Sequence, residues 1–330
     1  MGEKMIAGLT PPDEVRKNYK INKFNRWMNS NEKFVHTAQR RYAKDFFECA
    51  SNIGKNKVFS RNASVYTMGS CFARNIERAL RGANINVLSD RLNIDPGIYT
   101  ANRDPSAAMN KFNIPSMKNE FLRAFGMMEV NDDPFIALDN DLYFDTSTAG
   151  LNLLPLETLR DVQGKIVDYA KLIEDADLFI ITLGLVEMFV DNYTGCVLNT
   201  SPHPLTMRKY PDRFYHYRPG YEYLKKELDE LLDLLAEKNK NLEIVVTVSP
   251  VPLQSTMTNE DVVVSNTYSK SLLRVLANSA VTERENVSYF PSYEMVMNSP
   301  RALTWQEDCI HVESAIVEQI TKKFITDWFE

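Results

Sequence analysis

The chain has 330 residues, of which 44% are hydrophobic and 25% are charged, and its formal net charge is −6. This composition is typical of a soluble globular protein, and the length suits one large α/β domain with insertions or two small domains. The acidic balance argues against binding to nucleic acid or to an anionic membrane, because contact with phosphates needs clustered Lys and Arg. No secretory signal pattern opens the sequence and no apolar run approaches membrane-spanning length, so we expect a cytoplasmic protein.

Cysteines are few and are not arranged as a metal site. Cys49, Cys71, Cys196 and Cys309 are too sparse for a disulfide framework and lack paired metal-ligand spacing. The chain also lacks a Gly-rich phosphate-binding loop. We therefore expect no metal ion and no other cofactor.

Residues 1–60 are polar and favour helix, most clearly over 33–49, where four aromatic residues lie among many charges. This pattern predicts a helical arm that packs on a main domain spanning 61–330. The aromatic and basic residues between 17 and 41 are also compatible with nucleic-acid contact, but the acidic balance favours packing on the chain's own domain.

The stretch 64–80 reads as a strand, a glycine turn and a helix. Residues 65–68 are β-branched, aromatic or apolar, Gly69 permits a sharp turn, and apolar residues recur at helical spacing from Phe72 to Leu80. Ser70 is thus placed where a strand ends and a helix begins, and where unpaired N–H groups and the helix dipole would stabilise an oxyanion. Ser70 is also a good N-cap residue, so the local pattern alone leaves capping and catalysis open.

The next elements are shorter and less regular. Residues 85–88 predict a second strand, and the loop over 89–103 contains Gly97, which is either a turn glycine or a site of close backbone approach to a substrate. Residues 104–158 form a long insertion of the kind that shapes pockets, with a hairpin or edge strand over 135–144.

The middle of the chain predicts a helix over 162–175 and a buried central strand over 177–183, which ends at Gly184. Glu187 follows as a polar residue that either contacts substrate or pairs with an Arg. A second insertion over 191–221 carries His203 and His216, which either line the pocket or are ordinary surface histidines.

The last third alternates helices and strands. We predict helices over 221–238, 266–282 (capped by Ser265 or Asn266) and 314–329, and strands over 242–249 and 287–290. Together these elements predict a three-layer α/β/α sandwich around a parallel sheet of about five strands, SGNH-like or flavodoxin-like in class. Ligands bind such sheets outside the carboxyl ends of the strands.

Asp308 and His311 precede the last helix and are three residues apart, a spacing that brings both side chains to one side of a helical turn. A hydrolytic serine needs a base to take its proton and a carboxylate to orient that base. Ser70, Gly97, Gly184 and the Asp308–His311 pair all follow predicted strands, so one site at the carboxyl edge of the sheet accounts for them all.

Several stretches together resemble one family. Gly69-Ser70-Cys71-Phe72-Ala73 is similar to the signature of the GSCFA family, a bacterial branch with SGNH (GDSL-like) architecture, and further matches follow in order at 98–101, 182–184, 249–253 and 289–294. The resemblance spans about residues 60–325. It implies that Ser70 is the nucleophile rather than Cys71, which a helix N-terminus would also activate.

The resemblance also implies oxyanion donors. In SGNH hydrolases the loop after the second strand supplies a backbone N–H, for which Gly97 is the candidate. The broad superfamily has Gly-x-Asn-Asp where this chain has Gly184-Leu185-Val186-Glu187, and valine cannot donate. Asn199 resembles the asparagine that follows this strand in GSCFA proteins and is the candidate for the remaining oxyanion donor. Asn192 is a weaker candidate for the same role.

These observations predict a serine esterase that acts on an acyl ester, preferably an O-acetyl ester of a carbohydrate, through a Ser70–His311–Asp308 triad and an acyl-enzyme. The carbohydrate preference follows from the resemblance and not from any residue. The alternatives are an O-acyltransferase with the same site, a catalytically silent protein that binds a glycan or a protein partner, and a cysteine hydrolase that uses Cys71. The sequence predicts no oligomeric state.

Overall fold

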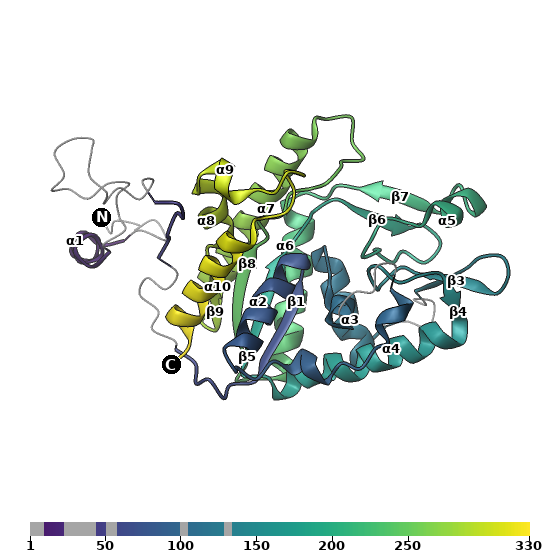
Figure 1. Ribbon diagram of the computed structural model, residues 1–330, viewed down its shortest axis with the longest axis horizontal. Coiled ribbons are helices and arrows are strands. Elements are labelled where there is room, and N and C mark those ends of the chain that lie inside the picture. The colour runs from purple at the N-terminus through teal and green to yellow at the C-terminus, as the bar shows by residue number, and fades with distance from the viewer. Residues whose placement is uncertain (1–9, 23–43, 51–57, 100–104, 129–133) are drawn as a thin grey trace, which may run out of the picture.

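The computed structural model describes residues 10–22, 44–50, 58–99, 105–128 and 134–330. Within these ranges the central sheet has four parallel strands, shown nearly edge-on in Figure 1. Their spatial order is β1 (Val65–Gly69), β5 (Leu178–Leu183), β8 (Glu243–Val248) and β9 (Val287–Tyr289).

The predicted strand over 85–88 is reduced to one contact. Val87 forms a single parallel bridge with Val65 at the free side of β1, and the chain then turns into a 3₁₀ helix, η2 (Leu88–Arg91). The cause lies in Ser89, whose hydroxyl donates to the buried carboxylate of Glu77 at 2.5 Å and accepts from Arg81. These bonds draw the chain onto the neighbouring helix before a ladder can form.

Both faces of the sheet are buried, as the apolar strands require. Side chains alternate between two cores: Tyr66, Met68, Phe179 and Ile181 enter one, and Val65, Leu178 and Ile180 enter the other. This alternation follows from the two-residue period of a strand.

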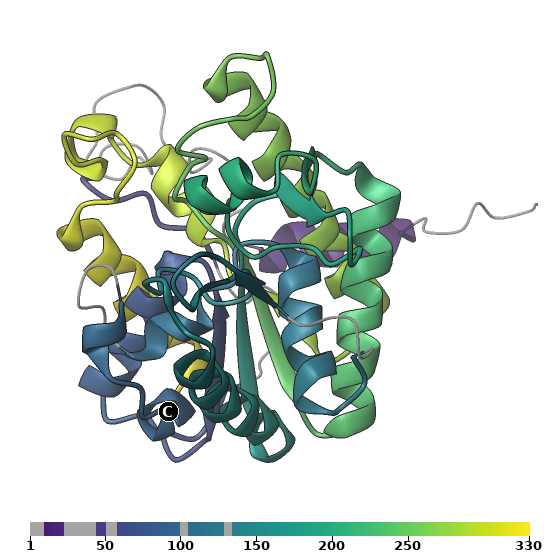
Figure 2. The same cartoon turned by 90° about the vertical axis from the view of Figure 1, so that its right-hand side faces the viewer.

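Helices cover each face (Figure 1; Figure 2 shows the same layers from the side). One core is closed by α2 (Cys71–Gly82), α8 (Ser292–Asn298) and α10 (Ser314–Trp328). The other is closed by α3 (Ile114–Ala124), α4 (Leu156–Lys171), α6 (Tyr221–Lys238) and α7 (Val262–Glu283). The predicted three-layer α/β/α class is therefore confirmed.

Helix boundaries depart from prediction in two places. The helix predicted over 266–282 begins earlier, because Asp261 is its N-cap and accepts a hydrogen bond from the N–H of Val263. Asn266, one of the predicted caps, lies inside the helix and accepts from the N–H of Leu253. The helix predicted over 162–175 is α4 followed by a 3₁₀ turn, η5 (Leu172–Asp175).

The remaining elements are small. The predicted hairpin near 135–144 is confirmed, because β2 (Phe135–Ala137) pairs antiparallel with β3 (Leu142–Asp145). The other short elements are, in chain order, η3 (Pro96–Ile98), η4 (Pro105–Met109), β4 (Leu154–Pro155), β6 (Met188–Asp191), α5 (Pro204–Lys209), β7 (Phe214–Tyr217) and α9 (Arg301–Thr304). The β6–β7 ribbon and α9 both lie beyond the end of the sheet that is uppermost in Figure 1.

The amino-terminal sixty residues are described only in part. Helix α1 (Pro12–Ile21) has no buried residue. Most of the helix predicted over 33–49 lies outside the described residues, and its described part, 44–49, is not helical. Phe46 and Phe47 are nevertheless buried, and the N–H of Phe47 donates to the hydroxyl of Ser299 at 2.9 Å. None of the described helices combines the length and the apolar character that crossing a membrane requires.

Candidate functional site

A cleft of about 500 Å³ lies at the carboxyl ends of the central strands. Its walls come from segments far apart in the chain: the start of α2, the loops after β5 and β8, the β6–β7 ribbon, and the connection between α9 and α10. This is the edge at which parallel α/β sheets bind ligands. Ser70, Gly184, Asp308 and His311 all line the cleft, and so do Asn199 and Glu187.

Ser70 is placed by the turn that precedes it. Gly69 has a φ of +144°, and a Cβ there would lie 2.3 Å from the carbonyl oxygen of Thr182, so only glycine allows β1 to end so close to β5. The N–H of Ser70 donates to that same Thr182 oxygen at 3.2 Å. Ser70 then caps α2, because its hydroxyl accepts from the N–H of Phe72 at 3.4 Å.

The Ser70 hydroxyl has a second partner that the sequence did not indicate. It donates to the hydroxyl of Ser249, the residue that directly follows β8, at 2.9 Å. Ser249 is fully buried and Ser70 is 4% exposed. Ser70 is thus both a helix cap and a cleft residue, and Ser249 holds its side chain in place.

A buried ionic network attaches α2 to β1 and fixes the position of Ser70. The carboxylate of Glu77 accepts from Thr67 at 2.6 Å and pairs with Arg74 and Arg81. Since Glu77 is completely buried, each of these partners offsets the loss of its hydration.

Asp308 and His311 form the pair that their spacing predicts. His311 Nδ1 lies 2.5 Å from Asp308 Oδ2, and the backbone N–H groups of Ile310 and His311 both donate to Asp308 Oδ1 at 2.9 Å. These three bonds lower the pKa of Asp308 to about 2, and the bond with the His311 ring has the largest effect. An ionised Asp308 assigns the proton on Nδ1 and leaves Nε2 of His311 to act as a base.

This pair is exposed, and it is not joined to the serine. The side chain of His311 is 58% exposed and that of Asp308 is 43% exposed. Among the hydrogen bonds of the described residues, none links the His311 ring to Ser70, although both residues line the same cleft. Catalytic hydrogen bonds often form only when substrate binds.

Gly184 passes very close to Ser70. A Cβ on Gly184 would lie 2.8 Å from the carbonyl oxygen of Phe112 and 3.3 Å from the Cβ of Ser70, so a larger residue would displace the serine or the loop. The Gly184 carbonyl accepts from the ammonium of Lys270 at 2.8 Å. Lys270 is fully buried in α7, and burial lowers its pKa from 10.5 to about 7.

Asn199 braces the loop before α3. Its Oδ1 accepts from the N–H of Phe112 at 2.9 Å, and its Nδ2 donates to the carbonyl of Asn110 at 2.7 Å, which leaves one amide hydrogen. Within the described chain, the adjacent N–H of Asn113 donates to no protein acceptor, and Asn113 also lines the cleft. No pattern in the sequence indicated Asn113, because it lies inside the long insertion.

Gly97 lies apart from these residues. Its N–H donates to the carboxylate of Asp95 at 2.8 Å, and it is not among the described residues that line the cleft. It lies in η3, within the loop that follows the 85–88 segment. The structure does not bring it to Ser70.

Glu187 pairs with a histidine rather than with an arginine. His216 Nε2 lies 3.2 Å from Glu187 Oε2, and both residues line the cleft. Cys71 lines it as well, next to Ser70. Within the described ranges, no group of three or more His, Cys, Asp or Glu side chains is arranged to hold a metal ion.

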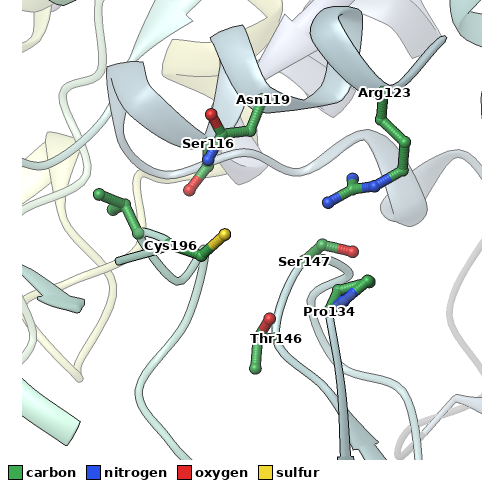
Figure 3. Close-up of a pocket in the computed structure, with 8 residues that line it drawn as sticks. Ser116, Asn119, Arg123, Pro134, Thr146, Ser147 and Cys196 are labelled. Atoms are coloured by element: carbon green, nitrogen blue, oxygen red, sulfur yellow. The ribbon is translucent and has the colours of Figure 1, made fainter. Parts of the chain in front are cut away.

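A second hollow, of about 10 Å³, lies where α3 faces the segment after β3. Figure 3 shows Ser116, Asn119 and Arg123 on one side of it and Thr146 and Ser147 on the other. Its volume is that of about one water molecule, so the hollow is too small for a substrate.

Comparison with known proteins gives one extensive match. Residues 64–324 match the model of the GSCFA family. The chain belongs to the GSCFA family. No curated protein matches it.

The structural comparison is much weaker. The salicylyl-acyltransferase SsfX3 from a tetracycline biosynthetic pathway matches at 14% identity, with a TM-score of 0.31, over 83% of this chain. The chain covers 57% of the length of that structure. A likeness of this size supports neither an activity nor a substrate for this GSCFA protein.

Proposed function

We propose that this GSCFA protein is an SGNH-like serine esterase or O-acyltransferase, with Ser70 as the nucleophile, His311 as the base and Asp308 as the carboxylate that orients it. The observation that carries the proposal is the convergence of a helix-capping serine and a preformed Asp–His pair on one cleft. These residues come from opposite ends of the sequence, and packing of the helices and strands for stability alone would not require them to share a cavity.

The chemistry follows the roles of a serine triad. The Nε2 of His311 takes the proton of the Ser70 hydroxyl while the oxygen attacks the ester carbonyl carbon. The tetrahedral intermediate collapses, the alcohol leaves with the proton from His311, and the acyl group stays on Ser70. Water, or the hydroxyl of a second substrate, then attacks the acyl-enzyme and restores the serine.

This mechanism requires the Ser70 hydroxyl to exchange partners. Its hydrogen now points to Ser249, so the hydroxyl must rotate toward His311 when substrate enters. The exposure of the His311 side chain gives the ring room to approach. Ser249 would hold the serine in a fixed, unreactive rotamer between turnovers.

The oxyanion would be held by the N–H of Asn113 and the remaining amide hydrogen of Asn199. Both residues line the cleft, and the amino end of α2 adds its positive dipole there. These donors replace Gly97, whose N–H is bonded to Asp95.

The charge of the cleft favours a neutral substrate. Among the described residues that line it there are two carboxylates, Glu187 and Asp308, but no Lys or Arg. A phosphorylated or carboxylated substrate would enter without a cationic partner and against like charge. An acylated sugar or polyol, uncharged and rich in hydroxyl groups, suits this lining best.

A catalytically silent glycan-binding protein is the second candidate. The bond from Ser70 to Ser249 favours it, because the hydroxyl hydrogen is given to Ser249 and not to the histidine. The hydrogen-bonded Asp308–His311 pair favours catalysis, since glycan binding alone would not require this pair to share a cleft with a helix-capping serine.

Turnover of p-nitrophenyl acetate distinguishes the esterase from the catalytically silent protein. We expect the wild type to release p-nitrophenol at a rate that saturates with substrate, and Ser70→Ala to lose activity by a factor of about 10³ or more. Cys71→Ser should stay active. A folded wild type without turnover would favour the silent protein, and loss of activity in Cys71→Ser but not in Ser70→Ala would identify a cysteine hydrolase.

A further inference from the structure

The cleft holds a second histidine–carboxylate pair that the proposed mechanism does not use. Glu187 ends the loop that leaves β5, and His216 lies on β7, paired in register with Phe189 of β6. The side chain of Glu187 is only 5% exposed and that of His216 is 21% exposed. Glu187 is therefore buried in the wall of the cleft, and His216 is partly exposed.

Glu187 is held by three donors. Thr256 donates its hydroxyl hydrogen to Oε1 at 2.8 Å, the N–H of Met257 donates to Oε2 at 3.2 Å, and His216 Nε2 is the third partner, also at 3.2 Å. Because a carboxylate only accepts, the hydrogen-bond network assigns the imidazole proton to Nε2. In the neutral ring, Nδ1 then carries the lone pair.

The Nδ1 atom of His216 accepts no hydrogen bond from the described part of the chain. The ring is held edge-on against Phe189, with centroids 5.5 Å apart, so it is fixed on one side by apolar packing and on the other by Glu187. Nδ1 is not one of the buried polar atoms of the described chain that lack a partner, so water or a ligand can supply its hydrogen. The ring thus presents an oriented acceptor in a cleft lined without Lys or Arg.

We propose that the Glu187–His216 pair binds a hydroxyl group of the neutral sugar or polyol that occupies this cleft, with Nδ1 of His216 as the acceptor. The identity of the ligand rests on the proposed function, whereas the geometry of the pair does not. In this role Glu187 is a positioning residue that fixes the ring, and His216 makes the contact. The pair would select for a hydroxyl at one position of the substrate.

The test measures binding without turnover, in the full-length Ser70→Ala variant with ¹⁵N-labelled histidine. Before ligand is added, we expect the His216 nitrogens to show a protonated Nε2 and a lone-pair Nδ1. Titration with methyl glycosides of glucose, galactose and xylose should shift the Nδ1 resonance of His216 for at least one of them.

Variants and analogues make the test specific. Adding His216→Phe should weaken that glycoside's binding by about 2- to 13-fold, the value of one neutral hydrogen bond. The matched control is His203→Phe, since His203 caps α5 outside the cleft, and this change should leave the affinity unaltered. With His216 present, one deoxy analogue of the glycoside should bind more weakly than the parent glycoside by the same factor. In the His216→Phe variant, the deoxy analogue and the parent glycoside should bind equally.

The outcomes separate this proposal from the esterase proposal. Binding that is equal in the His216→Phe variant, shifts confined to His311, or no binding of any neutral glycoside would overturn the hydroxyl site. A wild type that binds glycoside through His216 but releases no p-nitrophenol would overturn the esterase proposal alone. The corresponding methyl glucuronide should bind more weakly than the glucoside, because it adds a carboxylate to a cleft that already has two.

Discussion

The two histidine–carboxylate pairs of the cleft differ in exposure and in which ring nitrogen they use. Asp308–His311 is about half exposed and is bonded through Nδ1 at 2.5 Å, whereas Glu187–His216 is mostly buried and is bonded through Nε2 at 3.2 Å. An exposed ring can move toward a serine and exchange protons with bound substrate. A buried ring held on two sides can only present a fixed acceptor. The same two functional groups thus suit two different tasks.

The largest effect that we expect comes from the exposed pair. His311→Ala should lower kcat/KM for p-nitrophenyl acetate by about 10²- to 10⁴-fold, the usual contribution of a general base. The melting temperature should change little, since the side chain is exposed. If His216→Phe lost as much activity as His311→Ala, the two pairs would not have different roles, because the buried pair would then also act with Ser70 in catalysis.

Gly184 connects Ser70 to the buried pair, since it lies against Ser70 and begins the loop that carries Glu187. Gly184→Ala should remove most activity and destabilise the fold by about 1–3 kcal/mol, because the new methyl group overlaps the Phe112 carbonyl. Gly164→Ala is the control, as Gly164 is exposed within α4 with nothing within 4 Å of its Cβ position, and should stabilise by about 0.5–1 kcal/mol. Urea unfolding measures both. Equal stability of the two variants would contradict this account.

The carboxylates should differ in their effect on stability. Glu187→Gln exchanges a buried acceptor of three hydrogen bonds for an amide and should cost about 1–3 kcal/mol of unfolding free energy. Asp308→Asn should alter stability far less, because its partners are solvated. It should nevertheless lower esterase turnover, since the asparagine no longer fixes the imidazole tautomer. The reverse order of stabilities would show that Asp308 is the structural member.

Lys270, which holds the start of the Glu187 loop, makes stability depend on pH. Burial lowers its pKa from 10.5 to about 7, so between these values the unfolded chain binds a proton that the folded protein does not. Stability should therefore rise with pH across this window, and the cost of the buried charge is fully present below pH 7.

Lys270→Met removes that cost and should be more stable than the wild type by about 1 kcal/mol or more at pH 6. The advantage should shrink by pH 9.5, as measured by urea unfolding at both pH values. An advantage that does not change with pH would mean that folding does not lower the pKa of Lys270.

Local sequence patterns predicted much of the fold and the Asp308–His311 pair. The period of the apolar residues predicted α6 and the central strands, and a separation of three residues predicted that Asp308 and His311 would meet. Glu187 and His216 are 29 residues apart and meet only through the register of β6 with β7. No sequence period encodes such a pairing.

Other departures have the same origin. The strand expected over 85–88 does not form, because Ser89 donates a hydrogen bond to the buried carboxylate of Glu77 on α2. The contact of Ser70 with Ser249 depends on the distance between β1 and β8 across β5. Gly97 has the residue type of an oxyanion donor, but its N–H is satisfied by Asp95, two residues earlier. Contacts across the fold decided each of these positions.

Labelling with a fluorophosphonate, read by intact mass, shows directly whether Ser70 is a nucleophile activated by His311. We expect a single adduct on the wild type and on Cys71→Ser, no adduct on Ser70→Ala, and greatly slowed labelling of His311→Ala. An adduct that persists on Ser70→Ala, or none on the folded wild type, would contradict the assignment of Ser70 as a nucleophile activated by His311.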